Sequence, residues 1–166
     1  MQTSARLYTL TYDEAKTYLW AAIFVACNLV LPQVFHLIPQ GGIIFAPLSL
    51  VILAGAYKLG WRVGLIAALA SPLVNHLITG MPAWNMLAVM TFKLAVLALI
   101  AGMSAQYFKK ATWPLLIGVV LVSMLIGGLG ELALTGGIGA TIQDITIGWP
   151  GILLQLIGTY LVCKYL

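Results

Sequence analysis

Two ionisable side chains interrupt the long apolar runs of this sequence, Lys93 about ten residues into one run and Glu131 near the end of the next. If these runs cross a bilayer, a charge at its centre costs about 2.5–3.5 kcal/mol, so both side chains are expected to face the protein interior or water. We interpret both residues as lining a binding site. The alternatives are a buried Lys–Glu pair, or side chains that reach toward the membrane surface.

Further polar and aromatic side chains lie toward the ends of the same runs. The candidate site comprises Asn75, His76, Trp84, Asn85, Lys93, Glu131, Gln143, Asp144, Trp149 and Gln155, with Gln33, His36 and Gln40 in a connection on the same face. Amides, an imidazole, an ammonium and carboxylates among apolar residues are typical of a pocket for a polar, vitamin-sized ligand. For the two tryptophans the alternative is an interfacial aromatic belt, and for His76 an ordinary interfacial histidine.

Metal and enzyme chemistry are poorly supported by the spacing of these residues. The sequence contains no His-x-x-x-His, Cys-x-x-Cys or His-Glu spacing for zinc. Ser71 and Ser123 have no base at a defined spacing. We therefore expect no catalytic residues, no metal and no cofactor.

The composition indicates what must position these groups. Of 166 residues, 62% are hydrophobic and 7% charged, with a mean hydropathy of +1.06, whereas soluble domains carry about 25% charged residues. So short a chain could not bury this much apolar surface in water. We expect an all-α integral membrane protein with one transmembrane domain over residues 1–166. Cys27 and Cys163 both lie in apolar runs and are predicted to be small core residues.

Six runs approach the roughly 20 residues that a helix needs to cross the hydrocarbon core. They cover about 17–36, 43–59, 62–79, 84–107, 112–134 and 145–164. The second run is short, so a broken or re-entrant segment is an alternative there. Thr11 and Glu14 have the spacing of a capping box that would open the first helix.

Positive charges are distributed unevenly over the connections between these runs. Seven fall at the two termini and in the 2–3 and 4–5 connections: Arg6, Lys16, Lys58, Arg62, Lys109, Lys110 and Lys164. The 1–2, 3–4 and 5–6 connections contain no Lys or Arg. By the positive-inside rule this asymmetry predicts that both termini are cytoplasmic, and it supports the count of six.

Several short motifs resemble one known family. They are Ser71-Pro72-Leu73 followed by Leu77-Ile78-Thr79-Gly80-Met81-Pro82, Ala54-Gly55, Gly64-Leu65-Ile66-Ala67, Phe92-Lys93-Leu94-Ala95, Leu99-Ile100-Ala101-Gly102, and the pair Ala22 and Ala26. With six runs and no soluble module, the chain resembles the substrate-binding S components of energy-coupling factor (ECF) transporters. The resemblance covers all six runs in layout and residues 44–105 in detail.

The resemblance implies a vitamin or micronutrient importer in the cell membrane of a prokaryote. Its ligand pocket would lie near the outer face, covered by the 1–2 connection and lined by helices three to six. Ala22 and Ala26 match a docking motif for a transmembrane coupling (T) subunit, which two cytoplasmic ATPases drive. S components are thought to topple in the membrane and release substrate inward. Neither an enzyme nor a nucleic-acid partner is implied.

One departure from the family pattern concerns Lys93. We expect a glutamate there in this branch, so the charge of the pocket would be inverted, and a buried ammonium favours a ligand with a carboxylate or phosphate. A stand-alone secondary transporter or channel subunit is the alternative function, although no internal repeat is evident. A membrane enzyme using Glu131 or His76 as acid or base would need a second group that the sequence does not define.

Overall fold

The computed structural model describes residues 10–35 and 37–165, and within these residues the chain forms eight helices and no strand. The helices are α1 (Ala15–Phe35), α2 (Gly41–Phe45), α3 (Pro47–Leu59), α4 (Trp61–Thr79), α5 (Trp84–Phe108), α6 (Trp113–Thr135), α7 (Gly139–Thr146) and α8 (Trp149–Tyr165). Two residues used above, Arg6 and His36, lie outside the described residues.

The helices have the length and apolar character of membrane spans. In the described part of the chain, α1, α2 with α3, α4, α5 and α6 are each long and apolar enough to cross a bilayer, and α7 with α8 would make a sixth crossing if that bent pair counts as one. This result confirms the expected class, an all-α protein of several membrane-spanning helices.

Two of the predicted runs are broken. The second divides at Ala46, which has a left-handed backbone (φ 41°) and precedes Pro47, a position where helical conformation is disfavoured. The last run was expected to be continuous over 145–164, but α7 ends at Thr146 and α8 begins at Trp149, with a bend of 71° between the two helices. The close approach of Gly148 to the carbonyl oxygen of Asp144, 2.6 Å from where a Cβ would be, shows how tight this bend is.

Local signals account for several other helix ends. Glu14 Oε1 accepts hydrogen bonds from the backbone nitrogen of Thr11 (3.3 Å) and from its hydroxyl (3.2 Å), so the predicted capping pair forms just before α1. Gly80 ends α4 and Gly136 ends α6, each with a positive φ (73° and 76°) that glycine adopts without strain.

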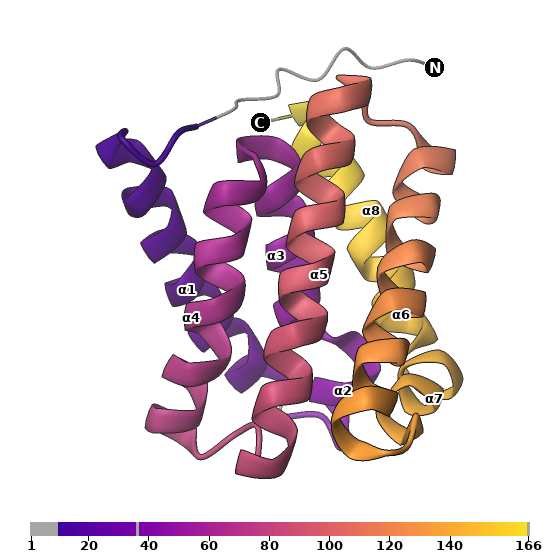
Figure 1. Cartoon of the computed structure of the whole chain (residues 1–166). Coiled ribbons are helices and arrows are strands. Elements are labelled where there is room, and N and C mark those ends of the chain that lie inside the picture. Colours follow the sequence, from indigo (N-terminus) through magenta and orange to yellow (C-terminus); the bar gives the residue numbers. More distant parts are fainter. Residues whose placement is uncertain (1–9, 36, 166) are drawn as a thin grey trace.

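Helix α3 lies at the centre of the bundle (Figure 1) and contacts α1, α4, α5 and α8. Every residue from 51 to 60 is buried, including Tyr57, whose hydroxyl donates a hydrogen bond to the carbonyl oxygen of Lys110 (2.5 Å). Helix α6 packs on the outer side of α5 and makes fewer contacts with α8. One of the two cysteines departs from expectation, since Cys163 is buried but Cys27 is exposed on the surface of α1.

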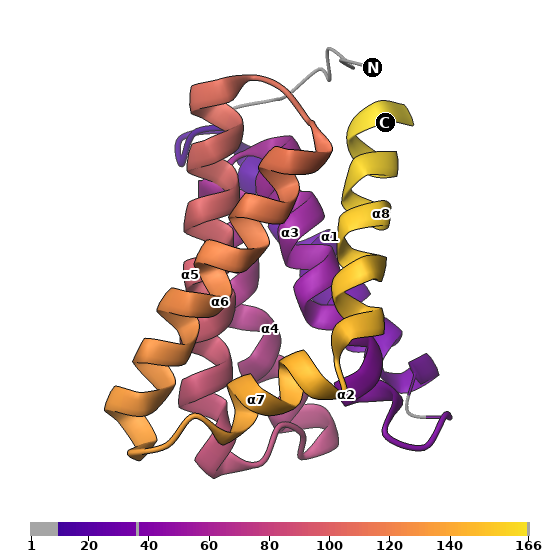
Figure 2. The ribbon, with the colours of Figure 1, turned by 90° about the vertical axis from the view of Figure 1, so that its right-hand side faces the viewer.

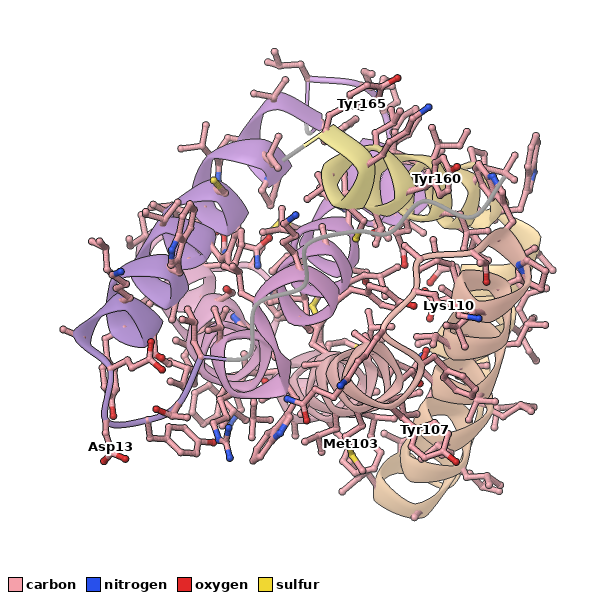
Figure 3. All side chains as sticks on the ribbon, turned by 90° about the horizontal axis from the view of Figure 1, so that it is seen from above. Asp13, Met103, Tyr107, Lys110, Tyr160 and Tyr165 are labelled. Carbon is pink, nitrogen blue, oxygen red and sulfur yellow. The ribbon has the colours of Figure 1, made fainter. Side chains whose placement is uncertain are left out.

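The two ends of the bundle differ in the helices that they carry. The first residues of α1 and the last residues of α8 lie at one end (Figure 1), and Figure 3 views that end, where Asp13, Lys110 and Tyr165 are labelled. The opposite end carries the two short helices, α2 and α7, and Figure 2 shows α7 crossing this end from α6 to α8. Two residues of α7, Thr141 and Asp144, line a cavity there together with residues of α5, α6 and α8.

Candidate functional site

The two charges predicted inside the apolar runs meet in the structure. Lys93 Nζ on α5 lies 2.9 Å from Glu131 Oε2 on α6, and 2.9 Å from Asp144 Oδ2 on α7. The Lys–Glu pair that the sequence left as an alternative is therefore present, with Asp144 as a second carboxylate on the same ammonium. Three helices contribute one charge each, so this charge cluster ties α5, α6 and α7 together.

Glu131 has several hydrogen-bond donors in addition to its ion pair with Lys93. Its side chain is 4% exposed and accepts hydrogen bonds from the backbone nitrogens of Ala140 (2.6 Å) and Thr141 (2.8 Å) and from the Thr141 hydroxyl (2.6 Å). These nitrogens belong to the first turn of α7, where amide groups lack partners within the helix and attract negative charge. Glu131 thus caps α7 and fixes its position against α6.

Two adjacent glycines of α6 make the close approach of these groups sterically feasible. A Cβ at Gly127 would lie 3.1 Å from Lys93 Cγ, and a Cβ at Gly128 would lie 3.1 Å from Thr141 Cγ2. Larger residues would push α5 or α7 away from α6. The glycine-rich turn of α6 is therefore part of what brings Lys93 and α7 to Glu131.

A cavity of about 90 Å³ lies beside this charge cluster. Its polar lining consists of Ser49, Lys93, Ser123, Thr141, Asp144 and Gln155. Its remaining lining consists of Ile43, Ala46, Leu94, Leu97, Val120, Met124, Gly148 and Ile152. A mostly apolar wall with a few converging polar groups is the usual composition of a small-molecule site.

Gln155 is the most unusual polar residue of this cavity. As a whole residue it is 6% exposed and its amide makes no hydrogen bond to a described residue, yet it is not one of the fully enclosed unpaired polar groups of the described chain, which are Asn28 Oδ1, Gln106 Nε2 and Thr159 Oγ1. Its amide is therefore reachable from the cavity that the side chain lines. Ser123 is also buried, but its hydroxyl donates to the carbonyl oxygen of Val120 (2.8 Å). An unpaired amide in the cavity wall provides a donor and an acceptor for a bound molecule.

A second cavity, of about 390 Å³, lies among α1, α2, the start of α3, α4 and α5. It is lined by Pro32, Gln33, Gln40, Gly42, Ile43, Pro47, Leu48, Asn75, Thr79, Met81, Pro82 and Met90. Ile43 lines both cavities, so α2 stands between them. The second cavity contains no Lys, Arg, Asp or Glu among its lining residues.

The predicted site residues divide into three groups. Lys93, Asp144 and Gln155 line the first cavity, and Glu131 lies behind Lys93. Asn75 lines the second cavity, together with Gln33 near the end of α1 and Gln40 in the connection between α1 and α2. The remaining predicted residues line neither cavity: His76, Trp84, Asn85, Gln143 and Trp149.

The polar stretch near the end of α4 has a packing role in this structure. Asn75 is buried, and its Nδ2 donates to the carbonyl oxygens of Asn28 (2.9 Å) and Ser71 (2.9 Å), which joins α4 to α1. His76 Nδ1 lies 2.8 Å from the carbonyl oxygen of Pro82, and its ring lies 5.3 Å from that of the exposed Trp84. These contacts hold the turn between α4 and α5 against the end of α4.

Three polar residues of the first cavity were not among the sequence candidates: Ser49, Ser123 and Thr141. Thr141 could have been found, because it follows a glycine-rich connection and opens a short helix whose free amide groups suit a nearby carboxylate. Ser49 carried no such signal, since its place in the wall depends on the break between α2 and α3. Within the described residues, no group of three or more His, Cys, Asp or Glu side chains could hold a metal ion.

Comparison of the chain with protein-family models, with curated proteins and with solved structures finds no match. The resemblance to ECF S components therefore depends on the motifs and layout described above. The site geometry adds an independent observation, a mostly apolar cavity with a few converging polar groups among membrane-type helices.

Proposed function

We propose that this protein is the substrate-binding subunit of an ECF-type importer, which captures a vitamin or related micronutrient at the outer face of a prokaryotic cell membrane. In this proposal α7 and α8 together form the sixth crossing, and both termini are cytoplasmic. A coupling subunit and two ATPases would then provide the energy for inward release.

The observation that carries the proposal is the first cavity. It lies among α5, α6 and α8 toward the end of the bundle that has α7 and α2, and an unpaired Gln155 amide and the Lys93–Asp144 pair are in its wall. At the other end of the bundle lie the basic residues Lys58 in the last turn of α3, Arg62 in the first turn of α4 and Lys110 in the connection between α5 and α6. If the basic end is cytoplasmic, the cavity is near the outer face, which suits capture of a solute from outside.

The short links between the helices also support a binding subunit that depends on partners. The links between successive helices in the described part of the chain are short, and none of them forms a module that could bind and hydrolyse ATP. Energy for uptake against a gradient would come from other subunits.

The surface of α1 suits the docking role that the resemblance assigns to it. Ala22 and Ala26 are both exposed and lie four residues apart, so they are on one face of the helix. Small residues at this spacing let a second membrane helix approach closely. In the proposal this face receives the coupling subunit.

The test is co-purification of the tagged chain with an ECF coupling subunit and its ATPases expressed from the same genome. We expect wild-type protein to retain them and the Ala22→Leu/Ala26→Leu variant to lose them. The matched control is Ala88→Leu/Ala133→Leu, which enlarges two exposed alanines on α5 and α6 and should retain the partners.

Two results would contradict the proposal. The first is that wild-type protein retains no coupling subunit, and the second is that the α1 variant retains as much as the control. Uptake of a solute by proteoliposomes that contain this chain alone, without ATP, would instead favour the stand-alone transporter.

A further inference from the structure

We infer that the first cavity recognises a cationic group of its ligand, such as a protonated amine, an amidinium or a positively charged ring nitrogen, and that Asp144 is the residue that pairs with it. This inference deepens the proposed function and rests on it in one respect, that the molecule held in the cavity is the transported solute.

The charge balance of the cluster is the first argument. One ammonium, Lys93, faces two carboxylates, Glu131 and Asp144, so the three groups together carry one net negative charge. Lys93 itself is surrounded by negative charge and is not available to an anion unless Asp144 leaves it. Lys93 alone would favour an anionic ligand. With both carboxylates beside it, an anion at this place would be repelled by Glu131 and Asp144.

The two carboxylates differ in exposure and in the number of hydrogen-bond donors around them. This difference indicates which carboxylate carries the negative charge that Lys93 does not balance. Glu131 is 4% exposed and has three hydrogen-bond donors on α7 in addition to Lys93. Asp144 is 46% exposed, and among the described residues its side chain accepts a hydrogen bond from Lys93 alone, through Oδ2. Its second oxygen, Oδ1, has no partner there. Asp144 also lines the cavity, whereas Glu131 does not.

The rest of the wall suits the remainder of such a ligand. Gln155, buried and without a hydrogen-bond partner among the described residues, can donate to or accept from a neutral polar group. Leu94, Leu97 and Ile152 provide an apolar surface for a ring or short chain. The apolar wall can therefore accept the apolar part of a small organic cation, and the volume of about 90 Å³ keeps the enclosed part of the ligand small.

Three probes of nearly the same shape and different charge test the inference: benzamidinium, benzamide and benzoate. Binding to the purified protein in detergent is measured for each by ligand-observed NMR titration. We expect benzamidinium to bind about tenfold or more tightly than benzoate, with benzamide between them, because a hydrogen bond to a charged group contributes about 1.5–3 kcal/mol.

Variants then locate the preference. Asp144→Asn removes the net charge at nearly constant shape, and we expect it to abolish the preference for benzamidinium over benzoate. The matched control is Asp13→Asn, the same substitution at an exposed aspartate at the other end of the bundle (Figure 3), and it should leave the order of the three probes unchanged.

The possible results separate clearly. Tighter binding of benzoate than of benzamidinium, binding of none of the three, or an unchanged preference in Asp144→Asn would each overturn the inference. If Asp144→Asn does not fold, the order of the three probes on the wild-type protein still decides. If the protein prefers benzamidinium but co-purifies with no coupling subunit, the proposed function is contradicted and the inference stands. If the protein co-purifies with its partners but prefers benzoate, the inference is contradicted and the proposed function stands.

Discussion

Replacing Lys93 with methionine tests how the charge cluster contributes to stability. Methionine keeps the unbranched stem that packs against Gly127 but removes the ammonium, which leaves Glu131 and Asp144 without their shared cation. Removing one partner of a buried ion pair is strongly unfavourable, because the other charge stays buried without compensation. We expect Lys93→Met to lower the free energy of unfolding substantially.

The magnitude follows from the burial of each carboxylate. Breaking a buried pair typically costs about 3–5 kcal/mol. Glu131 is 4% exposed but keeps its three donors on α7, so the lower end of that range, about 3 kcal/mol, applies. Asp144 is 46% exposed and adds about 0–1 kcal/mol. A second variant, Lys93→Met/Glu131→Gln, removes both charges of the buried pair and should recover part of the loss.

The assay is reversible unfolding in mixed micelles with increasing sodium dodecyl sulfate, followed by circular dichroism. Lys110→Met is the matched control, since that lysine is exposed and contributes only its backbone carbonyl to the contact with Tyr57. If Lys93→Met were as stable as this control, or if the second variant were less stable than Lys93→Met, the argument that the ammonium compensates a buried carboxylate would be refuted.

Two further substitutions test other parts of the structure. Gly128→Val should crowd Thr141, displace α7 and so speed limited proteolysis across residues 136–148. The control is Gly118→Val, where a Cβ meets nothing within 4 Å, and it should not change the rate of cleavage. Equal cleavage of the two variants would contradict the packing argument. Asn75→Ala should lower the free energy of unfolding by about 1–3 kcal/mol, because two buried carbonyl groups lose their donor. The control, Asn85→Ala, changes an exposed position and should have little effect in the same detergent titration. Equal stabilities of the two variants would contradict the assigned role of Asn75.

The sequence was sufficient to predict the class of fold and most helix bounds. Long apolar runs and their glycine and proline boundaries are local features, so α4, α5 and α6 begin and end within a residue or two of the predicted limits. The bend between α7 and α8 was missed because residues 145–164 are mostly apolar, although Gly148, Pro150 and Gly151 mark the place where the helix breaks. The count of crossings and their orientation stay predictions.

The site was predicted less completely, because its parts come from distant segments. Lys93 and Glu131 were noticed as charges in apolar runs, and Asp144 and Gln155 as polar groups of the last run. Their convergence on one cavity depends on the bend that places α7 across the end of the bundle (Figure 2). Trp84 and Trp149, expected as candidates or as interfacial residues, line neither cavity and are exposed. Exposure of this kind agrees with the interfacial alternative.

The measurement that tests the central claim most directly is untargeted mass spectrometry of the small molecules released from purified wild-type protein and from Gln155→Leu. This substitution removes an amide that makes no hydrogen bond to a described residue, so no hydrogen bond within the described structure is lost and the variant should be about as stable as the wild type. We predict that a small organic molecule is enriched in the wild-type sample and reduced in the variant. Identical small-molecule contents in the two samples would contradict the claim that this cavity binds the transported solute.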